Sequence, residues 1–492
     1  MGELTPTIII SVIGLYFLVL IAISYFTSKG ADTESFFTAD KQSPWFVVAF
    51  GMIGASLSGV TFISIPGKVG ADGHNMDFSY MQVVFGFLVG YFIIAKVLMP
   101  IYYSRNLTSI YTYLEERFGN NAYKLGAFYF LISRVVGASF RLYLVAIVFN
   151  AIGGMTGLEI PFWVFVMLTI MLIWIYTFKG GLKTIVWTDT LQTAFMLIAV
   201  VFTIYSISGA LGKNFSGLVE LVSTSDYSQM FFFDKGFEDP NNFFKQFISG
   251  IFMAIVMTGL DQDMMQKNLS CKSLKDAQKN MYSFSVVLVF VNLLFLTLGA
   301  LLYIYAASLG VETPEKSDLL FPTLALKHLP MTVGLFFILG LVAAAYSSAD
   351  SALTALTTSF CVDFLGFNKN KIQENKKKKT RTIVHIGFSI LLFVLILVFN
   401  TFNDDAIITQ LFIYSGYTYG PILGLFSFGI MTQWKVDNNW KIIAVCLLAP
   451  FITYFFNIND LFIGFKLGFL IILLNGILTF LGLWLISRNK NA

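Results

Sequence analysis

Long apolar runs recur along the whole chain, and short polar or basic segments separate them. Each run has enough residues to cross roughly 30 Å of hydrocarbon as an α-helix, which takes about 20 residues. In lipid, helices and closed barrels alone satisfy every backbone hydrogen bond, and the alternating pattern of barrel strands is absent here. We therefore predict an all-α membrane protein with thirteen transmembrane helices. They fall at residues 7–27, 45–67, 78–103, 122–152, 160–177, 185–211, 243–265, 280–309, 331–362, 382–400, 405–431, 440–457 and 462–486.

The composition agrees with this prediction. Of the 492 residues, 57% are hydrophobic and only 12% are charged, whereas a soluble domain has about 25% charged residues. The first run follows no basic segment and is too long for the core of a signal peptide, so we expect it to remain as a helix. The three cysteines are far apart and form no C-x-x-C spacing, which argues against a disulfide framework or a zinc site.

Basic residues predict the orientation of the chain. When successive loops are assigned to alternate sides, most Lys and Arg residues fall on one side, among them Lys183, Lys267 and the run at 368–382. The positive-inside rule makes this side cytoplasmic, which puts the N-terminus outside the cell inner membrane and the C-terminus in the cytoplasm. We interpret the basic run as a topology signal that also contacts anionic membrane lipid, and we expect no nucleic-acid binding.

Two of the apolar runs contain helix-breaking residues. GASLSGVTFISIPG at 54–67 has three glycines and Pro66, which lower helix propensity by about 1 and 3 kcal/mol per residue. MTGLDQDMMQ at 257–266 is also interrupted by glycine, in the corresponding place of the second half. Paired broken helices mark the midplane site of secondary transporters, because they free backbone carbonyls for a cation.

These breaks predict an internal repeat of two five-helix units with opposite orientation. The predicted parts are 1–44 with a peripheral first helix and a cytoplasmic loop, 45–211 and 243–431 as the two repeats, and 432–492 with two peripheral helices and a cytoplasmic tail.

Charged residues inside apolar runs are candidates for function, because burying a charge in lipid is expensive. Asp189 and Gln192 share a helical face, and we favour a functional role for Asp189 over an interfacial ion pair with Lys183. For Asp261 the functional and interfacial interpretations both stay open. We expect Asp263 near the cytoplasmic surface, paired with a lysine.

The stretch AAAYSSADSA at 343–352 places several oxygen atoms in one apolar run. Ala344, Ser347, Ser348 and Ser351 share a helical face, and Asp350 flanks it. Small residues and serines also serve helix packing, but packing gives no account of the carboxylate. Hard cations prefer carboxylate, carbonyl and hydroxyl oxygens, so we predict a site for Na⁺ or H⁺.

Arg134 and Arg141 lie seven residues apart on one face of the run 122–152. Either guanidinium could bind a solute carboxylate through its fork of donors. Either could instead neutralise an intramembrane aspartate. Both alternatives stay open, with the salt bridge favoured.

These segments resemble the sodium:solute symporter family, which includes bacterial galactose, sialic acid and proline transporters. GGLKTIVWTDTLQ at 180–192 is similar to the family pattern G-G-x-x-x-x-x-W-T-D-x-x-Q, and AAAYSSADSA is similar to its Ala/Ser-rich sodium helix. SIYTYLEERFG at 109–119 and GASLSGVTFISIPG add to the likeness, which covers essentially the full chain. The resemblance implies thirteen helices and two inverted five-helix repeats of the leucine-transporter type, working by alternating access.

The resemblance also implies binding residues. The main sodium site would use the backbone carbonyls of Gly54, Leu57 and Ala344 with the hydroxyls of Ser347 and Ser348. A second sodium site, present in some members, would involve Asp189, Ser347, Asp350 and Ser351. The solute would lie against Ser56, Ser58, Thr61, Gln82, Arg134 and Thr258. At the position of Asp350 the members compared carry an uncharged residue, so this carboxylate is an addition of this chain.

The function implied by the resemblance is sodium-coupled secondary active symport of a small polar solute, not enzyme catalysis. The polar residues that hold galactose in its transporter are replaced here, which favours a carboxylate-bearing solute such as sialic acid. A sugar or amino-acid symporter of the same fold, coupled to protons through Asp350, is the alternative. We expect Na⁺ as the cofactor and a protein that works as a monomer.

Overall fold

The computed structural model describes residues 5–71, 76–156, 160–178, 180–369, 372–402, 407–458 and 467–488. Within these ranges the regular structure is helical, and the β-pairing is confined to two isolated bridges. The prediction of an all-α fold is therefore confirmed. The α-helices are α1 (Pro6–Thr27), α2 (Thr33–Thr38), α3 (Trp45–Lys68), α4 (Tyr80–Ile93), α5 (Met99–Ser104), α6 (Thr112–Phe118), α7 (Asn120–Thr156), α8 (Phe162–Thr177), α9 (Leu182–Ala210), α10 (Phe215–Ser223), α11 (Phe243–Ala254), α12 (Gln262–Leu269), α13 (Leu274–Leu309), α14 (Leu320–Lys327), α15 (Met331–Ser359), α16 (Glu374–Phe402), α17 (Ile407–Met431), α18 (Trp440–Ile458) and α19 (Ile471–Ile486).

Ten helical segments of the described chain are long and apolar enough to cross a membrane, and the bent pair α11–α12 would make an eleventh. α4 and α5 join through a π-helical turn into one such segment, Tyr80–Ser104. The predicted count of thirteen is not confirmed, because α8 has only 16 residues and α17 is not among the ten. Residues 405–406 and 462–466 of two predicted runs lie outside the described residues.

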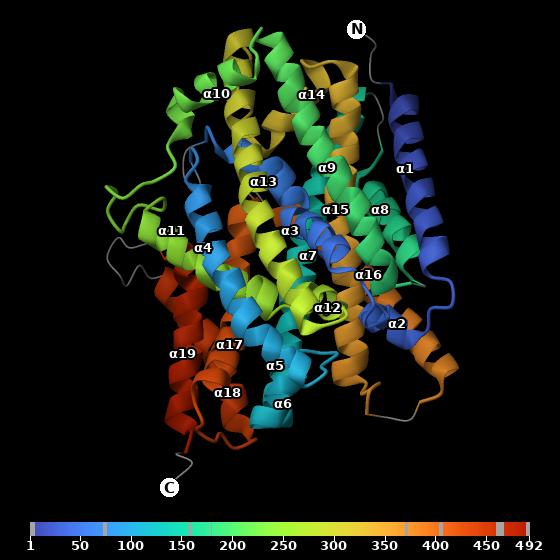
Figure 1. The fold of residues 1–492 in the computed structure, drawn as a ribbon, viewed down its shortest axis with the longest axis vertical. Coiled ribbons are helices and arrows are strands. Elements are labelled where there is room, and N and C mark those ends of the chain that lie inside the picture. Colours follow the sequence, from blue (N-terminus) through green and yellow to red (C-terminus); the bar gives the residue numbers. More distant parts are fainter. Residues whose placement is uncertain are drawn as a thin grey trace.

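Helices α3, α9 and α15 form the centre of the molecule and pack against one another (Figure 1). Of the apolar stretches that would cross the membrane, 83% of that in α3 and 72% of that in α15 is buried, against 28% in the peripheral α1. Small residues allow a close crossing: a Cβ on Gly54 would lie 2.2 Å from Thr193 Oγ1, and a Cβ on Gly51 would lie 3.1 Å from Asp189 Cβ. α3 therefore passes α9 at close range beside Asp189.

Polar residues fix the helix ends near this centre. Asp261 is the N-cap of α12, with its carboxylate accepting a hydrogen bond from Met264 N at 3.1 Å. Ser273 caps α13 in the same way through Asp276 N, and Gly310 ends that helix with a φ of 64°. These caps satisfy backbone N–H groups that the first turn of a helix leaves without partners.

The first and last helices lie at opposite ends of the molecule. α1 begins at the top of Figure 1 and α19 ends near its bottom, beside α17 and α18. Opposite ends are what an odd number of crossings would give. The orientation of the termini, the four predicted parts of the chain and the inverted repeat stay predictions.

Candidate functional site

The first predicted break is confirmed at Ser58, inside α3. This buried residue has φ 29° and ψ 172°, so the helix is interrupted there while its two halves remain helical. In a regular helix the carbonyls of residues 54–57 would accept from the N–H groups of residues 58–61. The non-helical geometry of Ser58 interrupts this ladder in the turn that contains Gly54 and Leu57.

The second predicted break is confirmed between α11 and α12. α11 runs into a π-helical turn at Ile255–Gly259, and after Leu260 the chain bends by 64° into α12. Asp261 stands at this bend with an extended backbone. The two breaks therefore lie in different helices of the interior, as the sequence pattern predicts.

A cavity lies between the two breaks. It includes residues of α3 near Ser58, and residues of α7, α11 and α13. Five of the six predicted solute ligands line it: Ser56, Ser58, Thr61, Arg134 and Thr258. Its wall also contains Arg141 and Asn292, whose polar side chains are not in the predicted set.

Gln82 is the predicted solute ligand that the structure places elsewhere. Its side chain is fully buried, with Nε2 donating to Asn241 O at 2.8 Å and to Gln246 Oε1 at 3.1 Å. Its Oε1 accepts from Phe232 N at 3.0 Å. Both ends of the amide are therefore used to fasten the segment before α11 onto α4.

Arg134 of α7 joins the aspartates at the second break. Its Nη1 lies 3.8 Å from Asp261 Oδ2, and its Nη2 forms an ion pair with Asp263 Oδ2. Tyr419 donates to Asp261, and Ser351 donates to Asp263. The expectation that Asp263 lies near the surface with a lysine is wrong: it is 2% exposed, because α12 turns inward and packs against α15.

Arg141, two turns further along α7, has different surroundings. It lines the cavity, is buried, and forms no ion pair or hydrogen bond with any described residue. Its Nε is a buried donor without a partner. A buried charge that forms no ion pair is unfavourable, so this wall of the cavity favours a negatively charged ligand.

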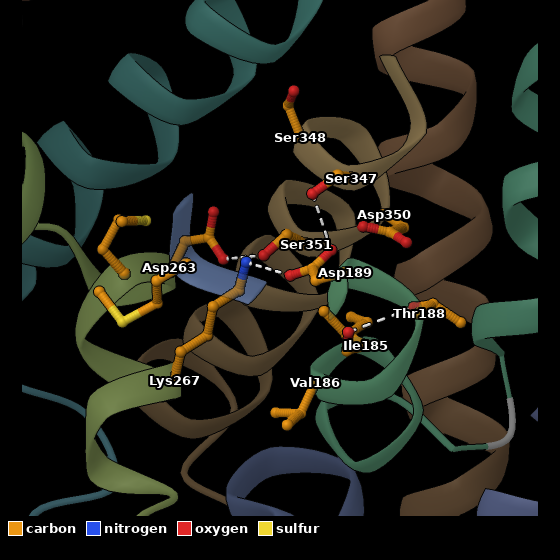
Figure 2. A network of polar contacts seen from close by, with 12 residues as sticks. Ile185, Val186, Thr188, Asp189, Asp263, Lys267, Ser347, Ser348, Asp350 and Ser351 are labelled. Atoms are coloured by element: carbon orange, nitrogen blue, oxygen red, sulfur yellow. Dashed lines mark hydrogen bonds and ion pairs between the residues drawn. The ribbon is translucent and has the colours of Figure 1, made fainter. Parts of the chain in front are cut away.

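Asp189 of α9 forms a buried ion pair with Lys267 of α12 (Figure 2). Lys267 Nζ lies 2.6 Å from Asp189 Oδ2, and Ser347 Oγ donates to Asp189 Oδ1 at 2.8 Å. The assignment of Lys267 to a cytoplasmic loop is wrong, since this residue is 1% exposed. The alternative partner Lys183 instead pairs with Asp40 at 2.9 Å, where hydrogen bonds from Ser35 and Lys183 lower the pKa of the Asp40 carboxyl.

Asp350 has one hydrogen-bonding partner among the described side chains. Tyr176 of α8 donates to its Oδ2 at 2.7 Å, while its Oδ1 is buried without a partner. In Figure 2 it lies beyond Asp189 as seen from Lys267. Of the predicted second sodium site, the structure thus joins Asp189 to Ser347, but turns Ser351 toward Asp263 and Asp350 toward Tyr176.

The hydroxyls of the predicted main sodium site lie on α15, facing the interior. Ser348 Oγ donates to Ala344 O at 2.8 Å, and Ser347 Oγ donates to Asp189. A hydroxyl whose hydrogen is engaged still has lone pairs for a cation. α15 packs against α3, the helix that contains Gly54 and Leu57.

Sequence analysis missed three features of this site: the Lys267–Asp189 ion pair, the Tyr176–Asp350 hydrogen bond and the lack of an ion pair at Arg141. The spacing of Arg134 and Arg141 marked both as candidates, but it could not separate them. Nothing in the local sequence identifies Lys267 or Tyr176 as a partner, because each contacts a distant helix.

Comparison with known proteins agrees with the all-helical fold. Residues 36–439 match the family model described as "Sodium:solute symporter family". The sodium/sialic acid symporter of Aliivibrio fischeri is 24% identical over 475 residues, covering 92% of this chain and 89% of that protein. A sodium-coupled monocarboxylate transporter of Mus musculus is 27% identical, covering 82% of this chain and 66% of that protein.

Solved structures show the same fold. A sodium-coupled sialic acid symporter in a substrate-bound, outward-open state superposes with a TM-score of 0.82 at 17% identity, covering 98% of both chains. The inward-facing transporter Mhp1 gives a TM-score of 0.52 at 15% identity, covering 91% of this chain and 93% of that one. The family match spans most of the chain, and the chain therefore belongs to the sodium:solute symporter family.

Proposed function

We propose that this protein is a sodium-coupled symporter that imports a small carboxylate-bearing solute by alternating access. The observation that carries the solute class is Arg141, a buried guanidinium in the cavity wall with no acidic partner among the described residues. A carboxylate would supply the missing charge through two parallel hydrogen bonds. Ser56, Ser58, Thr61 and Thr258 provide hydroxyls for the rest of the solute.

The relatives support this solute class. The family is one of transporters, and the similar proteins include symporters named for sialic acid and for monocarboxylates, both of which carry a carboxylate. Arg134 is the arginine that the resemblance favours for this role. Its ion pairs with Asp261 and Asp263 make Arg141 the better candidate.

Sodium is the coupling ion of this family. We place it between α3 and α15, with carbonyls of Gly54, Leu57 and Ala344 and the hydroxyls of Ser347 and Ser348 as ligands. This set offers the hard oxygen atoms that Na⁺ prefers. The support for it is the break at Ser58, together with two serines whose hydrogens are already directed elsewhere.

The break at Ser58 explains how the two ligands would be coupled. The turn before it supplies the proposed sodium carbonyls, while Ser56, Ser58 and Thr61 line the solute cavity. A bound sodium would fix the conformation of this turn and thereby the positions of the solute ligands. Each sodium that enters down a membrane potential supplies about 2.3 kcal/mol per 100 mV for accumulation.

We also propose the membrane location, orientation and oligomeric state of the protein. The protein is a multi-pass membrane protein, and we infer that it lies in the inner membrane of a bacterial-type cell with its N-terminus outside and its C-terminus in the cytoplasm. Contact with anionic lipid at the cytoplasmic face and function as a monomer complete this proposal.

Thermal unfolding of the purified protein tests the solute class. The ligands are sialic acid and its methyl ester, pyruvate and pyruvamide, and glucose, each in sodium chloride and in choline chloride. An acid at about 100 times its Kd stabilises the folded state by about 2.7 kcal/mol. We expect this for one of the acids in sodium, and for neither neutral analogue. Equal stabilisation by acid and ester would contradict the carboxylate, and equal stabilisation in choline would contradict the coupling.

A further inference from the structure

Asp189, which the family resemblance assigns to a second sodium site, forms an ion pair with Lys267. Asp189 Oδ1 accepts from Ser347 at 2.8 Å, and Oδ2 lies 2.6 Å from the ammonium of Lys267. Gln192 of the same helix adds an amide within 3.2 Å of Oδ1 in its hydrogen-bonding orientation. Carboxylate and hydroxyl oxygens suit an alkali cation. In this protein, however, the positive charge next to the Asp189 carboxylate is the ammonium group of Lys267.

The position of Lys267 is fixed by its own helix. Lys267 is the sixth residue of α12, which begins at the capping residue Asp261. Its carbonyl accepts from Ser270 Oγ at 2.7 Å and from Ser270 N at 3.1 Å, and its side chain is 2% exposed. The ammonium of Lys267 therefore belongs to a buried side chain on a well-anchored helix, and not to an exposed surface lysine.

The other charged side chains near Lys267 have partners of their own. Asp263, one turn before Lys267, is paired with Arg134 and accepts from Ser351. Asp350 lies beyond Asp189 and hydrogen-bonds Tyr176 (Figure 2). Asp189 is thus the one carboxylate of this group that forms an ion pair with Lys267 among the described residues.

We propose that Lys267 is a tethered cation that takes the place of a second sodium ion at Asp189, so that the protein binds one sodium ion instead of two. This inference rests on the proposed function only in assuming that the main site binds sodium. A sodium ion about 4 Å from the ammonium would be repelled, which at an effective dielectric constant near 20 weakens its binding by roughly a thousandfold.

Sodium binding to the purified protein tests this inference. Radioactive sodium bound per protein molecule is measured by scintillation proximity, with unlabelled sodium chloride as competitor and choline chloride to keep the ionic strength constant. The variants are Lys267→Met, which removes the ammonium but retains most of the side-chain volume, and the double variant Lys267→Met/Asp189→Asn. Lys275→Met, which removes an exposed lysine on α13, is the matched control.

The unmodified protein and Lys275→Met are expected to bind one sodium ion each, with a Hill coefficient close to one. Lys267→Met is expected to bind two, and the double variant is expected to return to one. Two ions on the unmodified protein, or a single ion on Lys267→Met, would overturn the inference. If Lys267→Met does not fold, the count on the unmodified protein still decides. Absence of sodium binding in all four proteins would instead contradict the proposed function.

Discussion

Arg134 and Arg141 stand on the same face of α7, two turns apart, and both reach the wall of one cavity. Arg134 is paired with Asp263 and approaches Asp261, whereas Arg141 forms no ion pair with a described residue and is influenced by Asp261 only from beyond ion-pair distance. The difference teaches that identical residues at helical spacing serve different purposes when their partners differ. Arg134 forms ion pairs that join α7 to α12, whereas we propose that Arg141 binds the solute.

Replacing the unpaired arginine should produce the largest functional effect. Arg141→Met removes the proposed partner of the solute carboxylate, so we expect kcat/KM for sodium-driven uptake to fall by about a hundredfold or more. The melting temperature without ligands should stay the same or rise, because a buried charge that forms no ion pair is lost. Uptake in proteoliposomes and thermal unfolding measure the two effects. Unchanged uptake would remove Arg141 from the site.

Replacing the paired arginine should act mainly on stability. Arg134→Met leaves Asp261 and Asp263 without their cation, and breaking a buried pair in this way costs about 3–5 kcal/mol. We expect a clear fall in melting temperature in detergent without sodium or solute. The comparison fails if the two arginine variants have equal melting temperatures.

The proposed sodium ligand Ser348 can be compared with Ser389, because each of these serines donates a hydrogen bond to a carbonyl of its own helix. Ser348 lies on α15 and donates to Ala344 O, and Ser389 lies on α16 and donates to His385 O. Ser348→Ala should raise the sodium concentration for half-maximal uptake by about tenfold, because the loss of one ligand weakens the binding free energy of sodium by roughly 1.4 kcal/mol. Ser389→Ala should leave it unchanged. Equal values for the two variants would exclude Ser348 as a ligand.

A smaller effect is expected where a carboxylate has a single neutral partner. Tyr176→Phe removes the hydrogen bond to Asp350 Oδ2, at a cost of about 1–3 kcal/mol in unfolding free energy. Tyr282→Phe, on α13, is the control for loss of a buried hydroxyl that has no hydrogen-bond partner. A melting temperature for Tyr176→Phe at or above that of the control would show that the hydrogen bond contributes nothing.

The smallest effect concerns Asp77, a carboxylate between α3 and α4 and outside the predicted membrane spans. Burial, with the nearby charge of Asp226 as a second cause, raises the pKa of Asp77 from 3.8 to about 6. A raised pKa in the folded state contributes stability that is complete below 3.8 and is lost as pH rises through about 6. Asp77→Asn should therefore show a smaller fall in melting temperature between these pH values. The same pH profile in both proteins would contradict the assignment.

The sequence predicts the features that depend on local composition. Glycine places the breaks near Ser58 and Gly259, and the apolar runs locate the helices, because both effects act within one segment; Pro66 lies inside α3 without breaking it. The ion pairs depend instead on how distant segments pack. Lys267 lies in a polar stretch that has the composition of a loop, and the bend between α11 and α12 brings it to Asp189, 78 residues away. Gln82 is a polar residue in an apolar run that the sequence marks as a solute ligand. In the structure it hydrogen-bonds the loop before α11 and does not line the cavity.

Uptake of a radiolabelled acid, the one selected by thermal unfolding, tests the central claim most directly. Proteoliposomes carry an inward sodium gradient, or an equal gradient of choline chloride, and contain either the unmodified protein or Arg141→Met. We predict concentrative uptake only with the sodium gradient and the unmodified protein. Equal uptake in choline, or full uptake by Arg141→Met, would contradict sodium-coupled transport of a carboxylate held by this arginine.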